Sequence, residues 1–163
     1  MTEQDPQARV WEIIEKAGVG MLTTRFGGGL RARPLEPRPD RHAGLILFVT
    51  DVRGGKDDEI ETDPAVGFVI VDAKAKAYLS ITGRAEVIRD PARAAAIWKK
   101  TDTVWWPAGP DDPNVRVLQL TPERAELWDG PSSKTVAAYE FAKARITGEK
   151  PDLGENRKVT VEL

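Results

Sequence analysis

Short stretches in which apolar residues alternate with polar ones, or follow one another, recur along the chain. Such stretches are typical of β-strands, and they predict strands at residues 19–24, 30–36, 45–50, 65–72, 77–89, 115–121 and 125–128. The run at 65–72 is almost wholly apolar, so we expect that strand to be buried on both faces. Gly83 predicts a bend or bulge within its strand. Pro122 separates the last two strands, because proline cannot donate a ladder hydrogen bond.

Helical spacing of apolar residues occurs near both ends of the chain and between the strands. Asp5 predicts an N-cap, Pro6 occupies the first helical position, and apolar residues then recur at helical spacing up to Gly18. Further helices are predicted at residues 56–62, 90–100 and 132–147. In the polar tail 148–163, the last residues, 158–163, are predicted to add a terminal strand or to lie on a partner.

Strands that do not alternate regularly with helices predict an antiparallel barrel with peripheral helices, in the α+β class and mostly β. The 163 residues have the length of one domain and contain no internal repeat, so we expect residues 1–163 to form a single domain. A barrel of this size is filled by its own side chains. A ligand is therefore expected on the outside of the barrel or at a seam between subunits.

Composition excludes several kinds of site. The chain contains no cysteine and one histidine, His42, which excludes disulfides, cysteine nucleophiles, and thiolate or multi-histidine metal sites. We expect His42 at the surface and no bound metal. The N-terminus lacks a signal segment, and no apolar run approaches the roughly 20 residues that span a bilayer. We therefore expect a cytoplasmic protein without membrane contact, and the net charge of −2 argues against nucleic-acid binding.

Arginines gather in one stretch of the chain. Between residues 25 and 41 there are five arginines against two acidic residues, a local net charge of +3: Arg25, Arg31, Arg33, Arg38 and Arg41. Charged side chains mostly lie on solvated faces, and we favour that interpretation for most of this set. The functional alternative is a small electropositive pocket for one anion.

The segment 48–56 combines features that suit a phosphate group. A strand ends at Thr50, a turn with Gly54 and Gly55 follows, and Lys56 stands where a helical pattern begins. The threonine hydroxyl and free backbone N–H groups can donate hydrogen bonds, while the lysine and the helix N-terminus supply positive potential. The alternative is an ordinary connector with a solvated lysine, because such passages are common.

Other short segments stand in a characteristic order: Gly20-Met-Leu-Thr-Thr-Arg25, Leu30-Arg-Ala-Arg-Pro-Leu35, Leu47-Phe-Val-Thr50 with Lys56, and Ile81-Thr-Gly-Arg-Ala-Glu86. Trp98, the segment 105–113, Ala125-Glu-Leu-Trp128 and the tail from Thr147 extend the series over nearly the whole chain. In this order the segments resemble the FMN-binding split-barrel superfamily of pyridoxamine 5′-phosphate oxidase, and most of all its bacterial general stress protein branch.

The resemblance implies a six-stranded antiparallel split barrel that forms a homodimer, with one FMN in each of two grooves at the interface. It assigns cofactor-binding roles to three segments: Arg33, Pro34 and Leu35 along the isoalloxazine and ribityl chain, Phe48, Val49 and Thr50 leading to the phosphate, and Lys56 at the phosphate.

The chain departs from the family pattern at two places. Gly54 and Gly55 stand where the family often has serine before the lysine, and where the oxidases have serine and arginine, so two side-chain contacts to the phosphate are lost. Hydrogen bonds to charged groups contribute about 1.5–3 kcal/mol each, so FMN affinity is expected below the family norm. Residues 125–131 contain neither the arginine nor the histidine that the oxidases use for their substrate. We therefore do not expect oxidation of pyridoxamine 5′-phosphate.

Two adjacent tryptophans, Trp105 and Trp106, stand in a segment rich in proline and glycine. They cannot both point into one core, so one is expected to wall the flavin of the neighbouring subunit; the alternative is that both pack within the protomer. We favour Trp106, because the proline and small residues after it let the segment approach a planar ligand. Trp105 follows the apolar Val104 and is expected to continue a buried turn.

Two functional hypotheses follow. In the first, the protein is a flavin-dependent oxidoreductase acting on a small-molecule electron donor or substrate, and the chemistry resides in the cofactor, so no catalytic side chain is assigned. In the second, it is a non-catalytic flavin-binding or storage protein of the stress response, or a split barrel that has lost its cofactor. The cofactor is expected to be FMN, or another phosphorylated flavin or a deazaflavin. The framework from Arg33 to Lys56 favours the first hypothesis, and Gly54 with Gly55 favours the second.

Overall fold

The structure is a computed structural model that describes residues 5–54, 56–129, 142–148 and 157–163. Its elements follow one another in the order α1 (Pro6–Lys16), β1 (Gly20–Phe26), β2 (Gly29–Leu35), β3 (Arg38–Asp40), β4 (Leu45–Asp51), the 3-10 helix η1 (Val52–Gly54), α2 (Lys56–Thr62), β5 (Ala65–Asp72), β6 (Ala77–Ile88), α3 (Pro91–Ile97), the 3-10 helix η2 (Lys100–Val104), β7 (Val115–Asp129) and β8 (Arg157–Glu162). Residues 142–147 are also helical, whereas most of the helix predicted at 132–147 lies outside the described residues.

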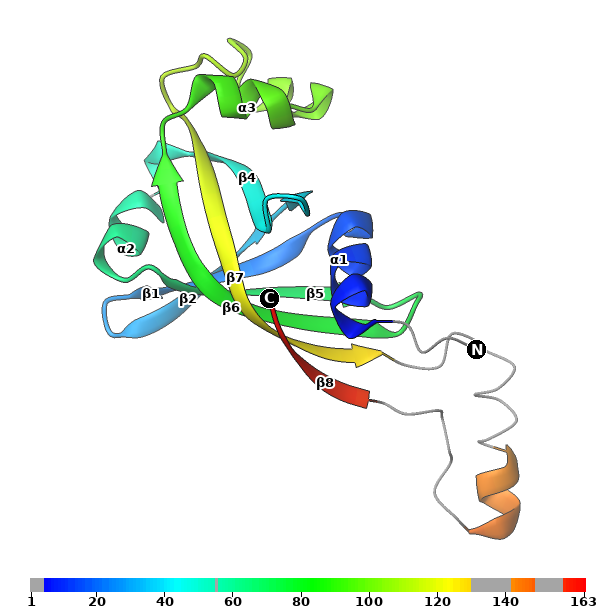
Figure 1. The fold of residues 1–163 in the computed structure, drawn as a ribbon. Helices are drawn as coiled ribbons and strands as arrows, with labels where there is room; N and C mark the ends of the chain where they lie inside the picture. Colours follow the sequence, from blue (N-terminus) through cyan, green and yellow to red (C-terminus); the bar gives the residue numbers. More distant parts are fainter. Residues whose placement is uncertain (1–4, 55, 130–141, 149–156) are drawn as a thin grey trace.

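All strands belong to one antiparallel sheet, in the order β2-β1-β5-β6-β7-β4-β3, with β8 added beside β7 (Figure 1). The long, curved strands β6 and β7 run through the middle of the molecule in Figure 1. The strands at the two ends of this order, β2 and β3, do not pair with each other within the described part of the chain, so the barrel is open on one side. This confirms the antiparallel split-barrel class, although β3 and β8 raise the strand number above the expected six.

Helices α1, α2 and α3 begin where the sequence predicts, and α1 and α3 end a few residues earlier. In α1 the Asp5 carboxylate accepts a hydrogen bond from the backbone N–H of Gln7 at 3.1 Å, which confirms the predicted N-cap. The face of α1 that carries Val10 and Ile14 is buried. Helix α3 ends at Ile97 instead of residue 100, because Trp98 adopts an extended backbone and the chain then continues into η2.

The prediction that β5 is buried on both faces is wrong. Phe68 and Ile70 are buried, whereas Val69 and Val71 are 39% and 60% exposed. The inner face of β5 packs into the barrel, but its outer face has no cover among the described residues. The apolar residues of the outer face therefore form a surface that the described part of the chain leaves exposed.

The prediction of two strands separated by Pro122 is also wrong, because β7 is continuous from Val115 to Asp129. The register between β6 and β7 shifts between Thr82 and Gly83, which confirms the predicted irregularity at Gly83. Pro122 lies opposite Gly83 at this shift, so its missing N–H falls where regular pairing is already interrupted. The backbones approach closely here, and a Cβ on Gly83 would lie 2.9 Å from the Pro122 Cα.

Two hydrophobic clusters surround β4. The first fills the barrel with fully buried side chains, and within it the rings of Phe48 and Phe68 meet edge to face with centroids 5.0 Å apart. The second lies between β4, β7 and α3 and contains Val49, Trp106 and Val117. Successive side chains of a strand point to opposite faces, so β4 is buried on both sides and holds a fixed position. The interior is filled by side chains, as expected.

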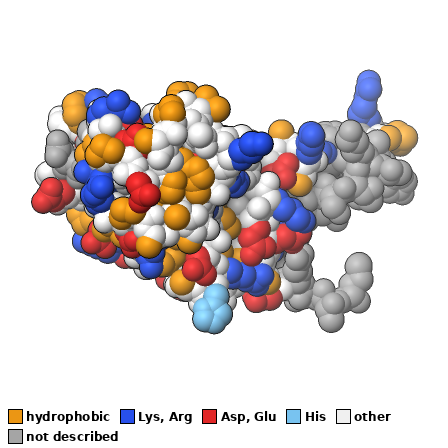
Figure 2. Space-filling view, turned by 90° about the horizontal axis from the view of Figure 1, so that it is seen from above, with side chains coloured by type: hydrophobic (Ala, Val, Ile, Leu, Met, Phe, Trp, Pro, Cys, Tyr) orange, Lys and Arg blue, Asp and Glu red, His pale blue; other side chains and the backbone are white. Residues whose placement is uncertain are grey.

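The surface mixes both signs of charge. On the face shown in Figure 2, acidic and basic side chains are interspersed, and the histidine stands at the surface. His42 lies in the turn between β3 and β4 and is exposed, as predicted. In the part of the chain that the structure describes, no helix is long and apolar enough to cross a membrane.

Candidate ligand site at the opening of the barrel

A cavity of about 330 Å³ lies at the opening of the barrel, between β2 at one end of the sheet and β3 and β4 at the other. Its lining residues come from these strands, the segment before β1, the link between β2 and β3, and η2 with the two residues after it: Val19, Pro34, Leu35, Glu36, Arg38, Val49, Asp102, Trp105 and Trp106. The volume is that of a small-molecule pocket. The structure thus brings together four of the residues assigned to the cofactor, namely Pro34, Leu35, Val49 and Trp106.

Two strand edges face this opening. β2 pairs only with β1, and β3 pairs only with residues 45–47 of β4, so residues 48–51 have no ladder partner on that side among the described residues. Backbone groups at such edges can bind a ligand that lies along them. The side chains of Phe48 and Thr50 are buried, at 0% and 2% exposure. A ligand could therefore reach this part of β4 mainly through its backbone.

Arg33 belongs to a buried polar cluster around Glu59 of α2. The Glu59 carboxylate accepts hydrogen bonds from the Thr24 hydroxyl at 2.6 Å, from Arg31 at 2.8 Å and from Arg33 Nη2 at 2.6 Å. Burial raises the pKa of Glu59, but the hydrogen bonds from Thr24 and Arg33 and the two arginine charges outweigh it, so the pKa lies below its usual value. The carboxylate is therefore ionised at neutral pH and orients Arg33.

One nitrogen of Arg33 is left over. Nη1 is buried and has no hydrogen-bond partner among the described residues. Buried donors are nearly always paired, so this N–H group is suited to an acceptor that the described residues do not supply. A phosphate or carbonyl oxygen would satisfy it, which means that the residues present fit an anionic ligand beside β2.

Most of the clustered arginines are exposed, as expected, namely Arg25, Arg31 and Arg41, but the other two are not. The side chains of Arg33 and Arg38 are only 14% and 8% exposed, and both are paired with carboxylates. Arg25 forms an ion pair with Asp63 at 3.2 Å, and Arg41 is exposed. The local positive charge predicted from the sequence is thus largely compensated by acidic residues that are distant in the chain.

The predicted phosphate segment is described in part. Asp51 accepts hydrogen bonds from Arg53 through Nε and the backbone N–H, both at 2.8 Å, and from Trp106 Nε1 at 3.0 Å. The hydrogen bonds from Arg53 are the main reason why the pKa of Asp51 lies far below its usual value. Arg53 is therefore engaged by Asp51. Lys56 begins α2 as predicted, but its side chain and Gly55 lie outside the described residues, so their roles stay predictions.

The two adjacent tryptophans differ in burial, and Trp105 does not take the position expected for it. Trp105 is 75% exposed, so the prediction that it continues a buried turn is wrong. Trp106 is 8% exposed, and its ring centroid lies 6.0 Å from that of Trp98. The hydrogen bond to Asp51 and the packing on Trp98 draw Trp106 into the second cluster, which leaves the neighbouring side chain pointing outward. Both tryptophans nevertheless line the cavity.

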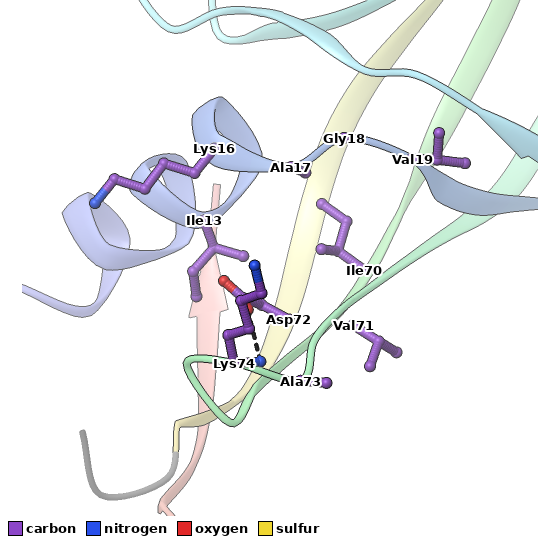
Figure 3. Close-up of a pocket in the computed structure, with 10 residues that line it drawn as sticks. All are labelled: Ile13, Lys16, Ala17, Gly18, Val19, Ile70, Val71, Asp72, Ala73 and Lys74. Carbon is purple, nitrogen blue, oxygen red and sulfur yellow. Dashed lines mark hydrogen bonds between the residues drawn. The ribbon is translucent and has the colours of Figure 1, made fainter. Parts of the chain in front are cut away.

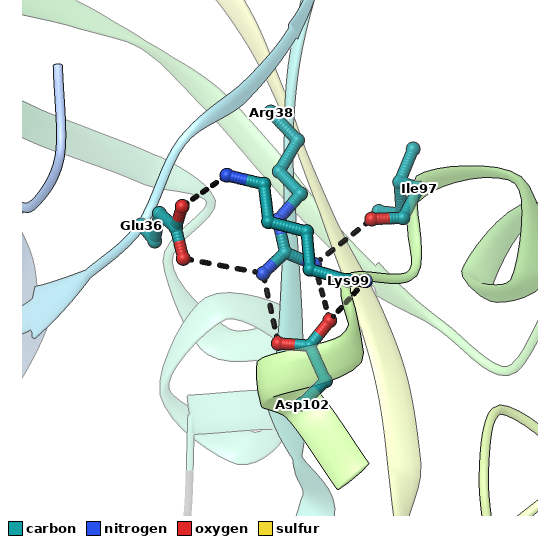
Figure 4. Close-up of polar contacts among 5 residues, drawn as sticks. All are labelled: Glu36, Arg38, Ile97, Lys99 and Asp102. Carbon is teal, nitrogen blue, oxygen red and sulfur yellow. Dashed lines mark hydrogen bonds and ion pairs between the residues drawn. The ribbon is translucent and has the colours of Figure 1, made fainter.

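Sequence reasoning missed a buried network at the base of the cavity. Asp102 of η2 accepts two hydrogen bonds from Arg38 of β3, at 2.8 Å and 2.8 Å, and a third from the Lys99 backbone N–H at 2.8 Å (Figure 4). Glu36 accepts hydrogen bonds from Arg38 at 3.4 Å and from Lys99. Burial raises the pKa of Asp102, but the hydrogen bonds from Arg38 and the Lys99 backbone lower it by more, so the pKa lies below its usual value. The only sequence signal was the charge of these residues.

A second cavity, of about 440 Å³, lies beside the end of α1 and the turn between β5 and β6 (Figure 3). Its walls include Ile13, Ile70 and Lys16, and the Asp72 carboxylate in it accepts a hydrogen bond from the Lys74 backbone N–H at 3.1 Å. It contains none of the residues assigned to a cofactor. The opening of the barrel is therefore the candidate site.

The protein is an open antiparallel barrel with a ligand-sized cavity at its opening. These features place it in the class of split-barrel proteins. The chain belongs to the pyridoxamine 5′-phosphate oxidase like family, which it matches over residues 5–152. General stress protein 26 of Bacillus subtilis (strain 168) is 27% identical over 145 residues, which are 86% of this chain and 100% of that relative. These findings confirm the family and the general stress protein branch.

Solved structures agree. A protein from Jannaschia sp. CCS1 described as a general stress protein 26 has a TM-score of 0.82 and 28% identity, and the match covers 99% of this chain and 100% of that one. The general stress FMN/FAD binding protein of Xanthomonas citri has the same fold, with a TM-score of 0.69 and 23% identity over 78% of this chain and 90% of its own.

Proposed function

We propose that residues 1–163 form a single flavin-binding domain that holds FMN at the opening of the barrel and acts as a flavin-dependent oxidoreductase on a small molecule. The observation that carries this proposal is the arrangement along β2. The Nη1 of Arg33, which has no partner among the described residues, offers a donor for an anion, and two residues further on Leu35 lines a cavity that includes two tryptophans. An anionic group joined to a planar aromatic ring matches this order of features.

The assigned residues would bind different parts of the ligand. Arg33 with Thr50, the backbone at Gly54 and Gly55, and Lys56 would hold the phosphate. The ring would lie beside Pro34, Leu35, Val49 and Trp106, with the backbone at Phe48 along its path. A general stress protein of the same fold that is named for FMN/FAD binding supports a flavin as the ligand.

A homodimer would complete the site. The outer face of β1, β5 and β6 carries exposed apolar side chains that pair across strands, Met21 opposite Val69 and Val71 opposite Tyr78. Contiguous apolar surface of this kind favours a protein interface, and a second copy is the occupant that the family resemblance implies. The dimer would place apolar surface from one protomer next to the opening of its partner.

In this proposal FMN, when bound, supplies redox chemistry at its ring, while the protein binds and orients it. Glu59 keeps Arg33 in place, and the buried β4 provides a fixed wall. Gly54 and Gly55 favour the alternative of a flavin carrier without catalysis, since they remove two side-chain donors. Another phosphorylated flavin or a deazaflavin would fit the same features, and pyridoxamine 5′-phosphate is not proposed as the substrate.

Titration of the purified protein with FMN and with riboflavin tests the site. The Lys56→Ala variant should bind FMN about ten- to a hundred-fold more weakly, because one hydrogen-bonded charge contact contributes about 1.5–3 kcal/mol. Its affinity for riboflavin should hardly change. Lys74→Ala, at an exposed lysine beside the second cavity, serves as the control. Equal loss of both flavins in Lys56→Ala would show that the lysine acts on the ring site or on folding.

Two further measurements separate the alternatives. Bleaching of the flavin absorption by NAD(P)H would support the oxidoreductase, whereas tight binding without reduction by any donor would support the carrier. Absence of binding of FMN, riboflavin and a deazaflavin to the wild-type protein would contradict the proposal as a whole. Light scattering reports the oligomeric state, and a monomer that binds FMN at one-to-one stoichiometry would remove the dimer from the proposal.

A further inference from the structure

Trp105 stands at the mouth of the cavity with its side chain held outward. It is 75% exposed, while the adjacent Trp106 is 8% exposed and is fixed by its hydrogen bond to Asp51. A single exposed apolar residue is ordinary on a protein surface, so exposure alone has no meaning. The backbone that carries Trp105, however, is more strongly fixed than a surface segment requires.

Asp102 is the centre of that support. Its carbonyl oxygen accepts the backbone N–H groups of both Trp105 and Trp106, each at 3.0 Å. Its carboxylate accepts two hydrogen bonds from Arg38 and one from the backbone of Lys99 (Figure 4). One residue thus binds the start of η2, its end and strand β3 together.

Arg38 connects this support to the sheet. It is 9% exposed, lies in β3 and also donates a hydrogen bond to the carbonyl oxygen of Ile97 at 3.0 Å. A buried ion pair often adds no stability over well-packed apolar residues of similar volume. In some proteins, however, such a pair favours one conformation of the chain over others. Here the arrangement selected is the one with Trp105 directed outward beside the cavity.

We propose that Trp105 forms a wall of the ring-binding part of the site, against which the planar ring of the ligand packs, and that Asp102 is the positioning residue for it. The inference rests on the flavin-binding function proposed above and adds two residues that the family resemblance did not assign. A large aromatic ring on a rigid support loses little conformational entropy when a ligand packs against it. Aromatic pairs also contribute beyond the area that they bury.

Variants at Trp105 test the wall, with riboflavin as the probe because it carries the ring without the phosphate. Trp105→Leu should weaken riboflavin about two- to twelvefold, the factor that corresponds to one aromatic pair, and should weaken FMN by the same factor. Trp105→Phe should retain most of the affinity and increase the emission of the bound flavin, since phenylalanine does not quench it as indole does. All melting temperatures should match the wild type, because the indole is mostly exposed.

Val104 provides the matched control. It precedes Trp105, is 78% exposed and does not line the cavity. Val104→Ala should leave riboflavin affinity unchanged. If Trp105→Leu binds riboflavin as tightly as the wild type, or if Val104→Ala loses as much affinity, the wall assignment is wrong while the proposed flavin site stands. If the wild-type protein binds no flavin, the proposed function and this assignment fall together.

A double-mutant cycle tests the positioning role of Asp102. Asp102→Asn should lower riboflavin affinity, and in that background Trp105→Leu should cause no further loss, because the wall is already displaced. A purely structural Asp102 would give losses that multiply, and that result would overturn the positioning role. If Asp102→Asn does not yield folded protein, Arg38→Lys keeps the cation but removes the two-pronged contact, and the same cycle applies.

Discussion

Replacement of Glu59 by glutamine should destabilise the protein more than any other carboxylate-to-amide substitution on α2. Glu59 is 8% exposed, and its carboxylate accepts hydrogen bonds from Thr24, Arg31 and Arg33 at 2.6–2.8 Å. In Glu59→Gln one acceptor becomes an NH₂ group that faces donors. The guanidinium of Arg33, 14% exposed, then remains buried without a counter-charge.

The magnitude follows from these burials. Loss of one partner of a buried ion pair costs about 3–5 kcal/mol, because the other charge stays uncompensated. Arg31 is 44% exposed and regains hydration, so only the contacts of Arg33 and Thr24 contribute in full. We therefore expect a loss of about 3 kcal/mol in the free energy of unfolding, at the lower end of that range.

Urea denaturation at neutral pH measures this loss, with Glu61→Gln as the control. Glu61 is exposed on the same helix, and exposed substitutions usually change stability by less than about 0.5 kcal/mol. The two variants share the same chemical change, so the difference between them isolates the buried cluster. A loss below about 1 kcal/mol in Glu59→Gln, or one equal to that of Glu61→Gln, would refute the argument that Glu59 compensates a buried arginine.

Three further predictions follow from the structure. The pKa values of Glu59 and Asp102 are lowered on folding. The stability that their ionised forms contribute should therefore be complete above the unfolded-state pKa of about 4 and should be lost as the pH falls below it. A urea midpoint that does not decrease between pH 5 and pH 3 would contradict this. Gly83→Ala should lower the melting temperature strongly, since the added carbon would overlap the Thr121 carbonyl oxygen as well as Pro122, and an unchanged melting temperature would mean that the two strands separate freely. Val71→Glu, at a side chain that is 60% exposed, should convert a dimer to monomers in light scattering without lowering monomer stability, and a persistent dimer would place the interface elsewhere.

Local sequence patterns determined the elements and the family. The bounds of α2 and β5 and the N-cap of α1 followed from periodicity and capping, because these depend on residues within a few positions of one another. The irregularity at Gly83 was readable for the same reason. The ordered segments identified the superfamily, and with it the strands that meet at the opening of the barrel.

Tertiary structure decided which faces are covered and which charges are paired. The apolar run of β5 predicted burial on both sides, but the described residues leave Val69 and Val71 on its outer face exposed. Pro122 predicted a strand break, yet the register shift opposite Gly83 accommodates the proline within one continuous strand. Composition cannot reveal either outcome, since both depend on what lies across the sheet.

The site shows the same division. The family resemblance predicted Arg33, Leu35 and Val49 at a ligand groove, and that role stays a prediction. The sequence could not show that Arg33 is held by Glu59, 26 residues away, or that Arg38 binds Asp102, 64 residues away. It also predicted a buried Trp105, whereas that side chain is exposed and Trp106 is the buried one. Local propensity acts over a few residues, whereas ion pairs and the choice of which aromatic ring enters the core are decided by contacts that exist only after the strands have been assembled into the sheet.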